Sequence, residues 1–338
     1  MTNPPTPSGP RGDAGPAVEV RGLRRTYGTG PRAFEAVRGV DLTVARGTVT
    51  ALLGTNGAGK TSTLEVVEGL ARASAGEVRV LGLDPVADRA EVRRRTGVLL
   101  QRSGFSGDLT VVETLRMWAA TVSDPRGVDE SLAMLDLAGR ADVRVAGLSG
   151  GEQRRLDLAM TLMGRPELVF LDEPSTGLDP ESRRGVWLLV EQLVAQGATV
   201  LLTTHYLEEA ERLAEHVAIM DAGRIVREGT QAEIVAGHPS EIRFETLPVG
   251  TATLPDLRGA RVSTDGAWTV VRTPDLQATL TALLGWAAAE DVVLPALGAR
   301  TASLESVFLE VADGTAADTA ADPAPTATPT DETLEVVR

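Results

Sequence analysis

The 338-residue sequence contains no cysteine, only 3% aromatic residues and no long apolar run. The lack of cysteine excludes disulfides, thiol catalysis and thiolate metal sites. None of its apolar runs approaches the roughly 20 residues that a membrane-spanning helix needs. Its first residues also lack the order of a signal peptide. We therefore expect a chain suited to a reducing cytoplasm, with any membrane role supplied through a partner.

Lysine is almost as scarce as cysteine. Lys60 is the only lysine, and every other residue with a permanently basic side chain is arginine. The formal net charge is −14 at pH 7, and the balance stays acidic when the acidic C-terminal segment is set aside. This charge argues against a nucleic-acid partner held by phosphate contacts, and we expect none.

Composition divides the chain into four parts. Residues 1–16 and 313–338 are rich in Pro, Gly, Ala, Thr and Asp, cannot bury enough apolar surface to offset the entropy of ordering, and are expected to be disordered tails, the second one acidic. Residues 17–238 form the main expected domain. The texture changes after residue 238, where short strands, a helix at 275–290 and a last helix at 301–311 predict a small accessory α+β domain over 240–312.

Apolar, partly β-branched runs recur through the main domain at 48–54, 96–101, 167–173 and 198–205, with helical stretches between them. This alternation predicts an α/β fold with a mostly parallel sheet and helices on its faces. Residues 216–229 predict a hairpin. The first run leads through a glycine-rich segment into a helix on which Leu64, Val67 and Leu70 share one face.

The glycine-rich segment matches the phosphate-loop pattern G-x-x-x-x-G-K-[ST] without a gap. Its glycines let successive backbone N–H groups point at phosphate oxygens, and the following helix adds its positive end. An ammonium suits this closed loop better than a broad guanidinium, and the next hydroxyl can bind Mg²⁺. The alternative is a glycine-rich turn with a solvated lysine. A phosphate loop alone also leaves kinases, GTPases, recombinases and other ATPases open. The expected nucleotide-binding residues are Gly54, Thr55, Asn56, Gly57, Ala58, Gly59, Lys60, Thr61 and Ser62.

Two further segments have the chemistry of a nucleotide site. The run LSGGEQ includes Ser149, Gly150, Gly151, Glu152 and Gln153 and opens a helix, which makes it either a second anion-binding terminus or a simple N-cap with two glycines.

The second segment is the apolar run 168–171, which precedes Asp172 and Glu173. A carboxylate at the exit of a buried strand can hold Mg²⁺ through water, and a turn-forming acidic pair before Pro174 is the alternative.

LSGGEQ followed by a strand and LDEP resembles the nucleotide-binding subunits of ABC ATPases, over about residues 17–238. The resemblance implies a P-loop NTPase fold of the ABC type, with an N-terminal antiparallel β part and an inserted helical subdomain at about 102–146. It implies hydrolysis of ATP with Mg²⁺ held by Thr61, Asp172 and Gln101. It also implies a head-to-tail homodimer, in which Ser149 and Gly151 contact the γ-phosphate bound by the partner's loop.

The same resemblance implies roles for single residues. Glu173 would be the general base, His205 would bind the γ-phosphate and steady the attacking water, and Gln101 would sense Mg²⁺ and link it to the helical subdomain. Asp179 would communicate across the dimer, and Tyr27 would stack on adenine. The alternatives are a structural histidine, a strand-end amide and a core tyrosine.

The chain resembles transport ATPases more than other ABC proteins. The chain carries one set of these motifs, leaves no room for a long coiled coil and has an acidic net charge. These features argue against the translation-factor and DNA-repair branches of the family. The segments 201–230 and SLESVFLEV resemble ATP-binding subunits of ABC-2 type drug and antibiotic exporters, which implies a separate polytopic permease that docks on 102–146 and a peripheral place on the cytoplasmic membrane face. Residues 102–107 depart from the family pattern. A soluble ATPase that remodels a protein complex, with 240–312 as its docking module, is the alternative.

Overall fold

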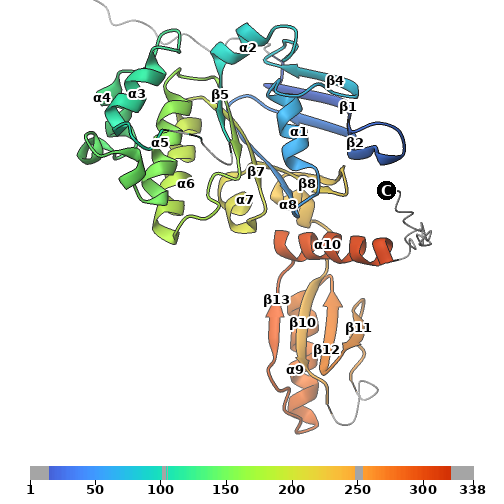
Figure 1. Cartoon of the computed structure of the whole chain (residues 1–338). Coiled ribbons are helices and arrows are strands. Elements are labelled where there is room, and N and C mark those ends of the chain that lie inside the picture. Colours follow the sequence, from blue (N-terminus) through green and yellow to red (C-terminus); the bar gives the residue numbers. More distant parts are fainter. Residues whose placement is uncertain (1–14, 101–103, 105, 248–253, 321–338) are drawn as a thin grey trace, which may run out of the picture.

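The computed structural model describes residues 15–100, 104, 106–247 and 254–320. A large α/β body carries a small α+β domain on one side, and the last helix lies between the two (Figure 1). Gln101, Arg102, Ser103 and Phe105 fall outside the described residues, so the structure does not bear on the roles expected of Gln101.

The main sheet has the strand order β5-β6-β7-β3-β8-β9 within the described residues. Its first five strands are parallel and β9 is antiparallel to β8. Because parallel strands end at one edge of the sheet, Gly54, Asp172 and Thr204 leave it side by side. The strands are β3 Val49–Gly54, β5 Thr96–Leu99, β6 Leu168–Asp172, β7 Thr199–Thr204, β8 His216–Asp221 and β9 Arg224–Gly229.

A second, antiparallel sheet of β2 (Phe34–Val44), β1 (Val18–Tyr27) and β4 (Ala75–Val80) lies beside the first. Helix α1 (Lys60–Val67) joins this sheet and the main sheet in one hydrophobic cluster. Leu64 and Val67, which were predicted to share one helical face, are both buried there. Leu70 was wrongly placed on that face: it lies beyond the helix end, after Gly69 at a φ of 70°, and is 47% exposed.

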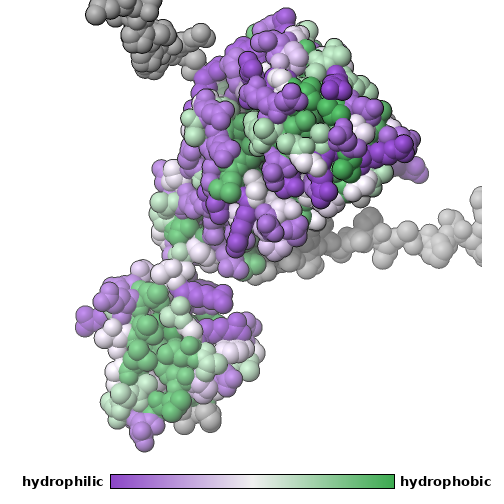
Figure 2. Space-filling view, turned by 90° about the vertical axis from the view of Figure 1, so that its left-hand side faces the viewer, coloured by the Kyte–Doolittle hydropathy of each residue, from purple (hydrophilic) through white to green (hydrophobic). Residues whose placement is uncertain are grey.

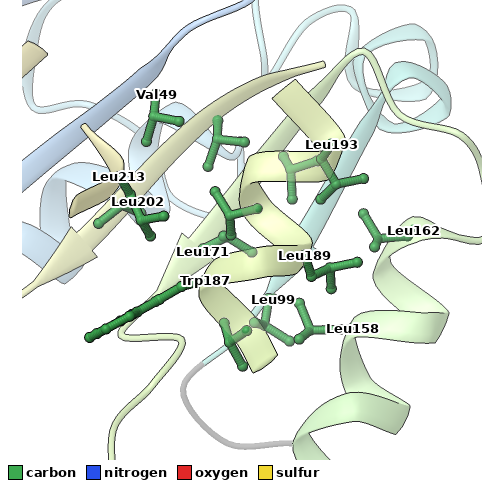
Figure 3. Packing of buried hydrophobic residues seen from close by; sticks show 14 of the residues in the cluster. Val49, Leu99, Leu158, Leu162, Leu171, Trp187, Leu189, Leu193, Leu202 and Leu213 are labelled. Carbon is green, nitrogen blue, oxygen red and sulfur yellow. The ribbon is translucent and has the colours of Figure 1, made fainter. Parts of the chain in front are cut away.

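Helices α5 (Gly150–Leu162), α6 (Pro180–Ala195) and α7 (Leu207–Leu213) pack on the other side of the main sheet. Figure 3 shows this cluster, in which side chains of the three helices meet those of the strands. The labelled residues are Leu158, Leu162, Trp187, Leu189, Leu193 and Leu213 from the helices and Val49, Leu99, Leu171 and Leu202 from the strands.

Helices α3 (Val111–Ala119) and α4 (Val128–Met134) pack on each other and on α5 and form the inserted helical part. Thr110 begins α3 with a reciprocal capping box to Glu113. The α/β body also contains α2 (Arg89–Arg95) and the short 3₁₀ turns Gly30–Arg32, Ala138–Arg140 and Val145–Gly147. The expected architecture, a mostly parallel sheet with an antiparallel β part and a helical insertion, is confirmed.

The C-terminal domain is an antiparallel sheet in the order β11-β12-β10-β13, with α9 (Leu276–Ala289) packed on it. Its strands are β10 Ser240–Glu245, β11 Arg261–Asp265, β12 Trp268–Thr273 and β13 Gly298–Arg300. Apolar residues gather on the face of this domain seen in Figure 2. Helix α9 has no charged residue, and Leu284 is 46% exposed.

Helix α10 (Leu304–Ala320) returns to the α/β body and contacts α7, β8 and α8 (Gln231–Val235). Leu304 and Val307 are buried in the main cluster, although the sequence grouped them with the accessory domain. The helix also continues past residue 312, where the sequence placed the start of the tail. The apolar stripe of α10 packs on the larger domain. Residue spacing predicts the stripe but not the domain against which it packs.

Candidate nucleotide site

The loop between β3 and α1 is held by close backbone contacts. A Cβ at Gly54 would lie 2.4 Å from the Met220 carbonyl oxygen, and one at Gly59 would lie 2.5 Å from that of Ala36. Gly59 also has a φ of 103°, which favours glycine. These contacts pin the loop between two sheets. Helix α1 therefore begins directly at the loop. The N–H groups of its first turn have no partner within the helix, so they can bind an anion.

The Lys60 side chain folds back over the phosphate loop. Its Nζ donates hydrogen bonds to the carbonyl oxygens of Gly54 at 2.9 Å and Thr55 at 3.1 Å, and it lies 4.0 Å from Glu173 Oε1. The side chain is 5% exposed, and burial lowers the pKa of its ammonium, with the carboxylates of Glu173 and Asp172 opposing the shift. A compact ammonium thus occupies a space that a planar guanidinium fills poorly.

Asp172 ends β6 directly opposite Thr203 of β7, and the Thr203 hydroxyl donates to Asp172 Oδ1. Burial raises the pKa of Asp172, while hydrogen bonds from Thr203 and Thr61 oppose the rise. The Thr61 hydroxyl and Asp172 are hard oxygen donors, the kind that Mg²⁺ takes sparingly from protein while it keeps phosphate and water ligands. No group of three or more acidic, His or Cys side chains that could hold a metal occurs among the described residues. The donor set fits a metal that arrives with phosphates.

Glu173 occupies the left-handed region with a φ of 45°, which is unusual for a residue with a side chain. Its N–H donates to the Thr203 carbonyl oxygen at 3.1 Å, and its Oε2 accepts from the Thr176 hydroxyl at 3.2 Å. Its Oε1 lies 3.2 Å from His205 Nδ1, although the ring is not aligned for a hydrogen bond. The turn therefore directs this carboxylate toward both the phosphate loop and the end of β7.

Tyr27 ends β1 and reaches the phosphate-loop helix. Its hydroxyl oxygen lies 3.1 Å from both Ser62 Oγ and Glu65 Oε2, and the Arg25 guanidinium lies 4.6 Å from the ring centre. The residue is 38% exposed, so it is not part of the hydrophobic core. The structure thus brings together Lys60, Thr61, Asp172, Glu173 and His205, with Tyr27 anchored beside them.

The residues of the LSGGEQ run, the signature segment 148–153 at the start of α5, are not part of this cluster. Ser149 is the N-cap of α5 in a capping box with Glu152, and Figure 1 shows α5 well apart from α1. Ser149 and Gly150 are exposed. Gln153 lies in the first turns of α5, and its amide donates to the carbonyl oxygens of Val145 and Leu148.

Gly151 and Asp179 meet at the start of α6. A Cβ at Gly151 would lie 2.3 Å from Ser182 Oγ, so only glycine fits there without displacement. Asp179 is the N-cap of α6 and accepts from the N–H groups of Glu181 and Ser182 at 3.0 Å each. The expected communication across a dimer by Asp179 stays a prediction.

Two residues of this region were missed in the sequence. Thr203 lies two positions before His205 on the strand next to Asp172, a neighbour that only the sheet order reveals. Arg154 follows the signature and is buried on α5, where it donates to backbone carbonyls around Glu173. Its signal was a charged residue at helical spacing from Gly151 and Leu158, both of them buried.

Comparison with known proteins identifies the family. An ABC transporter family profile matches residues 37–176, and a profile described as the C-terminal domain of ABC transporter domain-containing protein-like chains matches 240–303. A daunorubicin resistance ATP-binding protein DrrA3 of Streptomyces coeruleorubidus is 39% identical over 312 residues, which cover 87% of this chain and 95% of that protein. This chain belongs to the ABC transporter ATP-binding proteins. It is an ATPase with the P-loop fold of that family, as expected.

Other similar proteins include a Nod factor export ATP-binding protein I of Ralstonia nicotianae, 35% identical over 320 residues that cover 90% of this chain and 96% of that protein. A solved ATP-binding subunit of an ABC transporter has a TM-score of 0.58 and 28% identity, over 64% of this chain and 91% of that one. A dimeric ATP-binding cassette bound to ADP and phosphate, 24% identical over 63% of this chain and 98% of that one, shares the fold with the same TM-score. Among the described residues, no helix has the length and apolarity to cross a membrane.

Proposed function

We propose that this ATPase drives the export of a drug-like or antibiotic compound through a separate polytopic permease, as a homodimer at the cytoplasmic face of the membrane. The observation that carries the proposal is the convergence of Lys60, Asp172, Glu173 and His205 at one sheet edge. Support for export comes from the relatives, which include drug-resistance and Nod factor export ATP-binding proteins.

ATP binding begins at the phosphate loop. The β- and γ-phosphates lie against the N–H groups at the start of α1, and the Lys60 ammonium exchanges its two carbonyl partners for phosphate oxygens. Thr61 and Asp172 would hold Mg²⁺, which would offset the negative charge of the phosphates. The base stacks on Tyr27, whose hydroxyl contacts at Ser62 and Glu65 keep the ring close to the phosphate-binding helix.

Hydrolysis follows from the position of Glu173. Its carboxylate accepts a proton from a water molecule, whose oxygen attacks the γ-phosphorus as the bond to the β-phosphate oxygen breaks and ADP leaves. His205, 3.2 Å from the carboxylate, steadies that water and the γ-phosphate. The left-handed turn at Glu173 allows the carboxylate to face the phosphate loop.

The site is completed by a second copy of the chain. The exposed Ser149 and Gly150 open α5 away from the chain's own loop, which leaves them able to meet a nucleotide bound by another subunit. In the closed head-to-tail dimer Ser149 and Gly151 contact the γ-phosphate, and Asp179 lies beside them at the start of α6. Hydrolysis removes the shared phosphate, and the dimer opens because its closed form binds ATP better than the products.

The helical part offers a surface for the permease. Met117 is 53% exposed and Trp118 is 38% exposed on α3, and the Trp118 indole donates to the Met160 carbonyl oxygen at 2.9 Å. This bond ties the exposed end of α3 to the signature helix. A permease helix docked there can therefore respond to movement of α5.

The first experiment tests the transporter assignment. Tagged Glu173→Gln chain is purified from native membranes with ATP and Mg²⁺, and copurifying proteins are identified by mass spectrometry, with an untagged chain as control. We expect a multi-span membrane protein in stoichiometric amount. Recovery of soluble partners alone, with the chain absent from membranes, would contradict the exporter proposal and leave the ATPase assignment intact.

The second experiment tests ATP-driven export. A host that lacks the chain is complemented with the wild type or with Lys60→Met, which keeps an unbranched side chain but removes the ammonium. Wild type should restore resistance to the exported compounds, and Lys60→Met should not, because the phosphates lose their cationic partner. Resistance restored equally by Lys60→Met would refute ATP-driven export.

A further inference from the structure

Arg154 lies three residues after Gly151 on α5, and its guanidinium group is buried. The residue is 7% exposed and lies in the interior of α5, among the apolar residues of the main cluster. A buried charge is tolerated only where its donors are satisfied. The partners of this side chain therefore indicate what it does.

Those partners are backbone carbonyls of the catalytic turn. Nη2 donates to the carbonyl oxygens of Asp172 at 3.1 Å and Glu173 at 3.2 Å, and Nε donates to that of Pro174 at 2.9 Å. Nη1 donates to the carbonyl oxygen of Leu100 at 2.8 Å, the residue directly before Gln101. One side chain of α5 thus binds the main chain of two other segments, the turn at residues 172–174 and Leu100, which directly follows β5.

The convergence of three successive carbonyls on one guanidinium has a geometric consequence. In an extended strand, neighbouring carbonyls point to opposite sides, so those of residues 172–174 can face one group only across a turn. The left-handed φ of 45° at Glu173 provides that turn. Arg154 therefore stabilises the unusual backbone conformation that aims the Glu173 carboxylate at Lys60 and His205.

The link to the signature is short and stiff. Arg154 lies about 7.5 Å along α5 from Ser149, at 1.5 Å per residue. Asp157, one helical turn further, places Oδ2 3.9 Å from Arg154 Nη1 and helps to balance its charge. A shift of α5 at its N-terminus must move the guanidinium, and with it the carbonyls of the Glu173 turn.

We propose that Arg154 is a positioning residue for hydrolysis, which holds the general base in register with the signature helix through the carbonyls of residues 172–174. The proposal rests on the base role of Glu173 given above. Arg154 touches no substrate atom and acts through the position of the carboxylate. Its loss should therefore slow the chemical step and leave ATP binding nearly unchanged.

The test compares Arg154→Lys with Arg140→Lys in the full-length chain. Lysine keeps the charge but cannot satisfy carbonyls on three sides. Arg140 is on the surface beside the same helix and pairs with Glu152 at 2.6 Å. We expect Arg154→Lys to lower kcat at least tenfold with KM and the directly measured ATP Kd changed less than threefold, and Arg140→Lys to alter each less than twofold. Unchanged kcat, or a loss confined to KM, would overturn the proposal.

A double-mutant cycle separates positioning from a merely structural effect. Arg154→Lys is added to Glu173→Gln, and residual turnover is measured on protein whose thermal transition remains cooperative. If Arg154 acts through the carboxylate, the second change costs less than twofold, whereas multiplying losses would refute the proposal. If Arg154→Lys does not fold, Arg154→Gln, a shorter neutral donor, takes its place, and failure of both to fold would show that the role is structural and overturn the proposal. Wild-type turnover by Glu173→Gln alone would refute the base assignment itself.

Discussion

His205 Nδ1 lies 3.2 Å from Glu173 Oε1, at the exits of the neighbouring strands β7 and β6. The histidine follows the end of its strand, whereas the glutamate lies in a left-handed turn directly after Asp172. The pair faces the phosphate loop, because Lys60 Nζ lies 4.0 Å from the same carboxylate oxygen. A carboxylate and an imidazole are thus held together beside the phosphate loop, which is the arrangement that the proposed base and water-orienting roles require.

Glu173→Gln should slow ATP turnover by about a hundredfold or more, because the amide cannot accept the proton of the attacking water. ATP binding should persist, and the variant should accumulate as a closed dimer with ATP and Mg²⁺ in size-exclusion chromatography. Glu208→Gln is the control, since its side chain is 71% exposed on α7. Normal turnover by Glu173→Gln would show that another group is the base.

Tyr27→Ala should weaken ATP binding by roughly 5- to 150-fold, which corresponds to the 1–3 kcal/mol typical of a base stacked on an aromatic ring. Binding of inorganic triphosphate should change much less, because the phosphate loop is intact. Tyr27→Phe keeps the ring but loses the contacts with Ser62 and Glu65, and should bind ATP almost normally. Equal ATP affinity of Tyr27→Ala and wild type, measured by calorimetry, would rule out stacking.

Gly151→Ala should destabilise the chain by about 1–3 kcal/mol, the usual cost of overpacking. The new Cβ would meet Ser182 Oγ at 2.3 Å and Ser182 Cβ at 3.0 Å, so rotation of the hydroxyl alone cannot relieve the clash. Gly150→Ala is the matched control, because nothing lies within 4 Å of its added Cβ. Thermal unfolding should show a lower Tm for Gly151→Ala only, with partial recovery on adding Ser182→Ala, and equal Tm values would contradict the predicted clash.

Glu68 makes stability fall as pH rises. It caps the C-terminus of α1 and is 5% exposed, and its Oε1 has no hydrogen-bond partner in the part of the chain that the structure describes. Burial, with the carboxylates of Asp172 and Glu65, raises its pKa from 4.5 to about 8. The folded state therefore binds this proton more tightly than the unfolded state. The stabilisation from this proton is complete below about pH 4.5. It falls by up to about 1.4 kcal/mol per pH unit as the pH rises from there, and it is lost once the pH passes about 8.

Glu68→Gln should remove this dependence, because the amide stays neutral at every pH. We expect the variant to unfold at a higher temperature than wild type at pH 9, with a much smaller difference at pH 5. The exposed Glu215→Gln should leave the pH profile of Tm unchanged. A wild-type Tm that rose between pH 6 and pH 9 relative to Glu68→Gln would contradict the assigned sign.

Much of the site was predictable because its motifs are contiguous. The loop from Gly54 to Thr61 carries its own glycines, lysine and hydroxyl, and the apolar run before Asp172 identifies a buried strand that ends at a carboxylate. The buried strands could be recognised from their apolar runs for the same reason. Leu70 shows the limit of residue spacing as a guide, since α1 ends at Val67 and the positive φ of Gly69 turns the chain away from the helical path.

Arg154, Thr203 and α10 were not predictable in this way. Arg154 follows the signature along the chain but acts on carbonyls of residues 100 and 172–174, and no local pattern records that contact. Thr203 bonds Asp172 only because β7 lies next to β6. The residue spacing of α10 predicts an apolar stripe but does not say which domain the stripe packs against.

The sequence by itself determined the family, the phosphate loop and the order of strands and helices, because those properties depend on residues that are neighbours along the chain. Tertiary structure decided which groups share a site. It brought Glu173 and His205 to 3.2 Å, placed Ser149 on α5 away from the chain's own phosphate loop and returned α10 to the α/β body. The physical reason is that these contacts come from the order of strands in the sheet and from the burial of apolar faces, which are properties of the whole fold.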